Sequence, residues 1–139
     1  MQTERVIGIY LALVAVVTVA QSVMYPVYGY EPDGTAAGGA AAVWHVINWF
    51  LALGLAAVLS TTYREKRRLD AEASPDLRRW VGASVKFYAA VALTLAFAPN
   101  WVAVFAEQGE IGLVWYVINT SLPILFAVEG ARLWRNVRR

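Results

Sequence analysis

The chain has 139 residues, of which 59% are apolar and 16% are charged, and its formal net charge is +2. A soluble domain carries about a quarter charged residues, so this composition favours a membrane protein. The absence of cysteine excludes disulfides and thiolate chemistry, the single histidine argues against zinc or haem held by this chain alone, and the small net charge argues against nucleic acid as a partner.

Four long apolar segments follow one another along the chain, at residues 6–25, 43–62, 80–98 and 111–131. Each has the length that a helix needs to cross ~30 Å of hydrocarbon. With their flanks included, we expect helices at residues 5–25, 43–66, 75–98 and 111–136. The predicted fold class is an all-α integral membrane protein, a four-transmembrane-helix bundle in which residues 1–139 form a single transmembrane domain.

Prolines suggest where the predicted helices end. Proline lacks a backbone N–H and clashes with the preceding turn, so the first helix is expected to stop at Pro26 and the third at Pro99. Residues 101–105 would then form a short, separate interfacial segment. Pro123 lies well inside the fourth segment, where a kink or a locally open turn is expected.

The basic residues are unevenly distributed. Eleven of the twelve lie before the first segment, between the second and third, or after the fourth, and Lys86 alone lies within a segment. The charged residues of the first and third connections are all acidic. The positive-inside rule therefore predicts that both termini and the middle connection lie in the cytoplasm. We expect a multi-pass protein of the cytoplasmic (inner) membrane of a bacterium. A basic patch that binds an anionic partner is the alternative explanation for the middle connection.

The second and fourth segments are related in sequence. Residues 43–48 (VWHVIN) recur as residues 114–119 (VWYVIN), and an ungapped alignment of residues 43–68 with 114–139 contains ten identities. Both copies also end in arginines at equivalent positions. This internal repeat predicts two tandem helical hairpins, each beginning and ending in the cytoplasm.

Two ionisable residues, Lys86 and Glu129, lie inside the third segment and near the end of the fourth. A charge in hydrocarbon is costly unless it is paired or faces water, so we expect the two to approach each other as an intramembrane charge pair. The pair would serve packing or, alternatively, a coupling-ion or substrate site. Two other outcomes stay open: Lys86 could extend to the interface, and Glu129 could pair with Arg132.

The repeat also brings polar residues to equivalent positions. His45 and Asn48 share one helix face, and Tyr116 and Asn119 occupy the corresponding face of the fourth segment. We predict that these four residues form a polar cluster able to bind a ligand, with hydrogen bonding between helices as the alternative role of the asparagines. Haem ligation by His45 would need a histidine from a second chain. No metal or other cofactor is expected, whereas bound lipids are.

The sequence contains no phosphate-binding loop, HExxH motif, nucleophile elbow or acidic ligand cluster, and its motifs identify no known family. No catalytic residue is assigned, and an autonomous enzyme is not expected. We predict a non-catalytic accessory or structural subunit of a larger membrane complex, of the respiratory or oxygenase type, whose partners are other membrane subunits. The alternative is a small oligomeric transporter or channel that uses the charge pair and the polar cluster. A quinone- or haem-associated protein is a third hypothesis.

Overall fold

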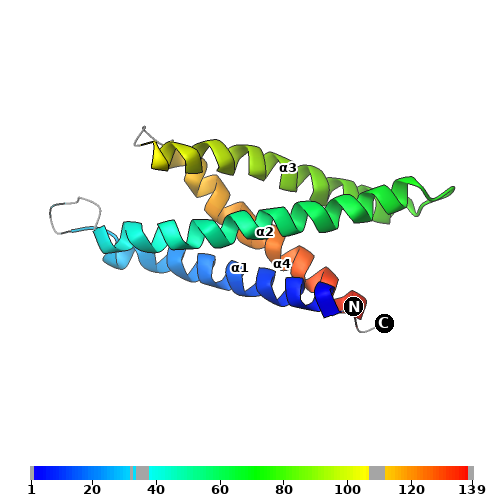
Figure 1. The fold of residues 1–139 in the computed structure, drawn as a ribbon, viewed down its shortest axis with the longest axis horizontal. Coiled ribbons are helices and arrows are strands. Elements are labelled where there is room, and N and C mark those ends of the chain that lie inside the picture. The colour runs from blue at the N-terminus through cyan, green and yellow to red at the C-terminus, as the bar shows by residue number, and fades with distance from the viewer. Residues whose placement is uncertain (1, 32, 34–37, 107–111, 138–139) are drawn as a thin grey trace. The chain divides into compact units, whose positions relative to one another are not determined.

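The described part of the chain forms four helices in the computed structural model, which covers residues 2–31, 33, 38–106 and 112–137 (Figure 1). The helices are α1 (Gln2–Tyr28), α2 (Gly38–Asp70), α3 (Leu77–Phe105) and α4 (Gly112–Val137). Each is long and apolar enough to cross a membrane. The all-helical class and the four apolar helices predicted from the sequence are therefore confirmed.

The predicted helix ends at two prolines were wrong. Pro26 lies within α1 and Pro99 lies within α3, and residues 101–105 form the last turns of α3 instead of a separate segment. Pro123 likewise lies within α4. Proline removes one backbone hydrogen bond of a helix, so the helix continues where other contacts hold the affected turn.

Aromatic contacts hold that turn in α3. The ring centroid of Trp101 lies 5.2 Å from that of Phe97 and 5.6 Å from that of Phe105, so the three rings form a row along one helix face. Asn100 adds a hydrogen bond from its Nδ2 to the carbonyl oxygen of Ala96, at 3.2 Å. These contacts span the turn that the proline weakens.

The chain divides into two compact units. One unit comprises Met1–Gly54 and Asn119–Arg139, and the other comprises Leu55–Ile118. We call them the terminal unit and the central unit. The terminal unit contains α1, the first part of α2 and most of α4, whereas the central unit contains the rest of α2, α3 and the first turns of α4.

Small residues allow close helix packing in the terminal unit. A Cβ atom at Gly130 of α4 would lie 2.9 Å from the carbonyl oxygen of Gly8 in α1, and a Cβ at Gly8 would lie 3.1 Å from the carbonyl oxygen of Gly130. Between α2 and α4, a Cβ at Gly54 would lie 2.6 Å from the ring of Phe126, which is fully buried. The glycines of this unit thus let the backbones of α1 and α4 approach each other closely, and they let the ring of Phe126 pack directly against the backbone of α2.

α1 and the first part of α2 lie side by side within this unit (Figure 1). The Tyr10 hydroxyl donates a hydrogen bond to the carbonyl oxygen of Phe50, at 2.8 Å. Farther along α1, the ring of Tyr25 packs edge-on against that of Trp44, with centroids 6.1 Å apart. Contacts at both levels align the two helices along their length.

The central unit is built around the hairpin of α2 and α3. Asp76 caps α3, because its Oδ1 accepts a hydrogen bond from the backbone N–H of Arg79 at 3.0 Å, so α3 begins at Leu77 and not at residue 75 as predicted. Phe97 is buried and packs edge-on against Trp115 of α4, at 5.9 Å between centroids.

The two repeat-related stretches of α2 and α4 bury equivalent positions. Six aligned pairs are buried in both copies: Ile47 and Ile118, Leu51 and Leu122, Gly54 and Leu125, Leu55 and Phe126, Val58 and Glu129, and Thr62 and Leu133. Their spacing of three or four residues defines one face of a helix. The sequence repeat therefore has a structural counterpart, with one buried position changed from an apolar to a charged residue.

Candidate functional site

The charged member of the repeat, Glu129, is a fully buried carboxylate in the terminal unit. Its side chain has 0% exposure and is held by Arg132 one turn later on α4. The Nε of Arg132 donates to Oε2 of Glu129 at 2.9 Å, and a second guanidinium nitrogen donates to Oε1. This two-point contact is the strongest geometry for a carboxylate and a guanidinium, and it offsets the cost of removing the charge from water.

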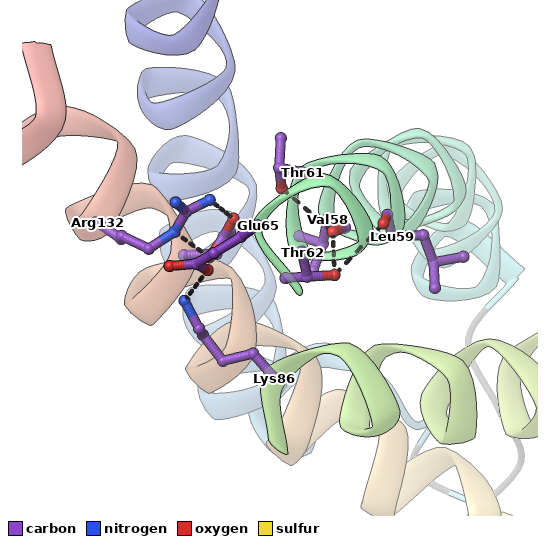
Figure 2. Close-up of polar contacts among 8 residues, drawn as sticks. Val58, Leu59, Thr61, Thr62, Glu65, Lys86 and Arg132 are labelled. Atoms are coloured by element: carbon purple, nitrogen blue, oxygen red, sulfur yellow. Dashed lines mark hydrogen bonds and ion pairs between the residues drawn. The ribbon is translucent and has the colours of Figure 1, made fainter. Parts of the chain in front are cut away.

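A second ion pair joins α2 to α3 in the central unit. The Nζ of Lys86 lies 2.6 Å from Oε2 of Glu65, and each side chain is only 17% exposed (Figure 2). Sequence analysis did not identify Glu65 as a partner of Lys86. The signal was present, because in an antiparallel hairpin with a short turn these two residues lie at similar distances from the turn, and a flexible lysine side chain bridges the remainder.

The same hairpin is tied again close to its turn. Lys66 pairs with Asp70 at 2.6 Å, and the indole Nε1 of Trp80 donates to the other carboxylate oxygen of Asp70 at 2.7 Å. The ammonium of Lys66 also lies 5.8 Å from the ring centroid of Trp80. One carboxylate therefore connects the end of α2 with the first turn of α3.

The predicted Lys86–Glu129 pair stays a prediction. Lys86 belongs to the central unit and Glu129 to the terminal unit, and each contacts an oppositely charged residue within its own unit. For Glu129 this residue is Arg132, the alternative partner considered from the sequence. For Lys86 it is Glu65, a carboxylate on the neighbouring helix of the same hairpin.

The predicted polar cluster is divided between the two units. His45, Asn48 and Asn119 belong to the terminal unit and Tyr116 to the central unit, so their assembly stays a prediction. His45 and Tyr116 are exposed, and Asn48 is buried. The Oδ1 atoms of Asn48 and Asn119 are both buried without a hydrogen-bond partner among the described residues. Repeat-equivalent amides thus share the same unusual state.

A third amide with one unpartnered atom lies in α1. Gln21 is buried, and its Nε2 has no partner in the described part of the chain, whereas its Oε1 accepts a hydrogen bond from the Tyr28 hydroxyl. Gln21 also lines a shallow groove of about 560 Å³ between α1 and α2, whose other walls are mainly apolar. A buried amide atom without a partner costs about 1–3 kcal/mol, so these positions are not explained by folding stability alone.

Over the described ranges, no group of three or more His, Cys, Asp or Glu side chains could hold a metal ion. A second shallow groove, of about 480 Å³, runs along α3 and is lined almost entirely by apolar atoms.

Searches against protein-family models, curated proteins and solved structures found no match to this chain.

Proposed function

We propose that the chain is a membrane-embedded, non-catalytic subunit whose α3 docks against helices of another membrane protein. The observation that carries this proposal is the exposure of α3. Only 17% of its most apolar stretch is buried, the lowest share among the four helices. Exposed apolar side chains on α3 include Val85, Leu95 and Val102.

The shape of this exposed surface favours a protein helix as its occupant. The groove along α3 is lined by three alanines, Ala98, Ala103 and Ala106, together with Pro99 and larger side chains. Small side chains let two helix backbones approach closely, which is how helices associate in a bilayer. A long apolar helix with a groove of this kind is better suited to packing than to catalysis.

The distribution of charge supports an orientation for this subunit. The helix ends on either side of the α2–α3 turn carry five arginines, whereas the described residues between α1 and α2 include the acids Glu31 and Asp33. Under the positive-inside rule, this charge distribution supports a multi-pass protein of the cytoplasmic membrane whose α2–α3 turn and both termini lie in the cytoplasm.

A transporter or channel is the second candidate, and Glu129 is the observation that favours it. A fully buried carboxylate occupies the position where the other repeat copy has Val58. Ionisable residues within apolar helices often mark ion or substrate pathways. In proteoliposomes, Glu129→Gln and Lys86→Met would then abolish a proton- or solute-dependent flux, whereas an unchanged flux would exclude both residues from transport.

Purification in mild detergent followed by native mass spectrometry tests the subunit proposal. We expect unrelated membrane subunits at fixed stoichiometry, and we expect Ala98→Leu, which fills the α3 groove, to release them. Ala92→Leu is the matched control, because Ala92 is also exposed on α3 but lies outside the groove. Recovery of the chain alone or only as a homo-oligomer would contradict the proposal, as would equal effects of the two variants.

A further inference from the structure

The cytoplasmic end of the central unit, as oriented above, displays five exposed arginines. Arg64, Arg67 and Arg68 lie on α2, and Arg78 and Arg79 lie in the first turn of α3. The spacing of three and four residues places the three α2 arginines on one helix face. We call these five residues the arginine face.

Most acidic residues of the same hairpin contact groups other than these arginines. Glu65 contacts Lys86, Asp70 contacts Lys66 and Trp80, and Asp76 caps α3. The guanidinium groups of the arginine face form no ion pair with any residue that the structure describes. The hairpin therefore neutralises its lysines internally and leaves its arginines available.

Aromatic residues place this face at the depth of lipid headgroups. Tyr63 and Tyr88 are exposed near the same end of α2 and α3, and such residues concentrate where hydrocarbon meets water. Arg64 directly follows Tyr63, and Arg68 lies only about 7.5 Å farther along the helix axis than Tyr63. The α2 arginines thus span the layer in which lipid phosphates lie.

We propose that the arginine face binds the phosphate groups of anionic phospholipids in the cytoplasmic leaflet. The proposal rests on the membrane embedding and orientation given under Proposed function, but not on the presence of a protein partner. Guanidinium groups bind phosphate oxygens through two parallel hydrogen bonds, and clusters of basic residues beside a membrane helix attract anionic lipids. Lipid fits this face better than an acidic protein because the arginines begin directly at the aromatic boundary.

Lipid retention by the purified full-length chain tests the proposal. Detergent micelles are doped with phosphatidylglycerol or with phosphatidylcholine, and the bound lipids are counted by native mass spectrometry. We expect retention of phosphatidylglycerol over phosphatidylcholine, and a loss of roughly fivefold for each arginine removed, in Arg67→Gln alone and in the triple change at positions 64, 67 and 68. Circular dichroism checks that each variant keeps its helical content.

Lys66→Gln is the matched control, because it removes the same charge at the neighbouring position from a residue that already contacts Asp70. We expect retention to change little in this variant. An equal loss in Lys66→Gln and Arg67→Gln would overturn the proposal, because it would mean that net charge alone attracts the lipid. Equal retention of the two lipids would also overturn it, and so would displacement of phosphatidylglycerol by millimolar inorganic phosphate. A missing protein partner in the co-purification would leave this result intact.

Discussion

Glu129 departs furthest from its surroundings, because it is a charged side chain at a position that the repeat otherwise fills with valine. Its neighbours in the buried stripe of α4 are Phe126 and Leu133. Removing Arg132 would leave a buried carboxylate without its two-point partner. We expect Arg132→Met to lower the free energy of unfolding by about 3 kcal/mol, measured by thermal or denaturant unfolding in detergent.

Glu129→Met is the matched control for that change. It removes the buried charge, and the partly exposed Arg132 can turn towards water, so we expect a clearly smaller loss of stability than in Arg132→Met. If the two variants were equally destabilised, Arg132 would not be the main partner of the carboxylate. A larger loss of unfolding free energy in Arg132→Met than in Glu129→Met would therefore show that the buried carboxylate needs Arg132 more than Arg132 needs the carboxylate.

The side-chain amides of Asn48 and Asn119 are unusual because of their hydrogen bonding. Both keep an Oδ1 without a donor in the described structure, at positions that the duplication made equivalent. An apolar residue of similar size would remove the cost of burying that oxygen. Under the subunit proposal, a donor on a partner helix would satisfy these two oxygens.

At the scale of the helices, the α1–α4 crossing depends on the absence of side chains at two positions. We expect Gly130→Ala to destabilise the protein by about 1–3 kcal/mol, because the new Cβ would lie 2.9 Å from the Gly8 carbonyl oxygen and would push the two backbones apart. Gly82→Ala in α3 should instead stabilise by about 0.5–1 kcal/mol, because its Cβ would meet nothing and alanine favours a helix. Thermal unfolding of both variants checks the difference in sign, and a shared sign would contradict the close approach.

The same elements show which parts of the fold the sequence could predict. Apolar length identified the four helices, because a helix that crosses a membrane must satisfy all of its backbone hydrogen bonds within an apolar segment. Helix ends at Pro26 and Pro99 were wrong because local propensity was given more weight than contacts between neighbouring turns. The partner of Lys86 was missed because it depends on how α2 and α3 pair, which no single segment reveals.

The candidate site was predictable to a smaller extent. Burial of Asn48 and the pairing of Glu129 with Arg132 follow from helix periodicity and from spacing along one helix. Whether His45, Asn48, Tyr116 and Asn119 assemble depends on packing between helices that the sequence does not encode locally. The repeat shows which positions of α2 and α4 are equivalent, but it does not show whether the residues at those positions contact each other.

At the scale of the whole molecule, the strongest asymmetry is in charge. The arginine face lies at the turn between α2 and α3, whereas the connection from α1 to α2 carries acidic residues. Translocating arginines across a membrane is unfavourable, so this asymmetry is the basis of the orientation that we propose. The chain contains no cysteine, so single introduced cysteines can report these sides without a background signal.

We expect Ser74→Cys, in the exposed turn before α3, to react with a membrane-impermeant maleimide only from the cytoplasmic side. Gly38→Cys, at the exposed start of α2 where a side chain meets no other atom, should react only from the opposite side. Labelling of intact cells compared with inverted vesicles measures both accessibilities, and labelling after detergent treatment controls for reactivity. Reaction of both cysteines from one side would contradict a membrane-spanning α2, and the reversed pattern would place the arginine face outside the cell. That second result would also remove the basis for lipid binding in the cytoplasmic leaflet, so this measurement should precede the lipid experiment.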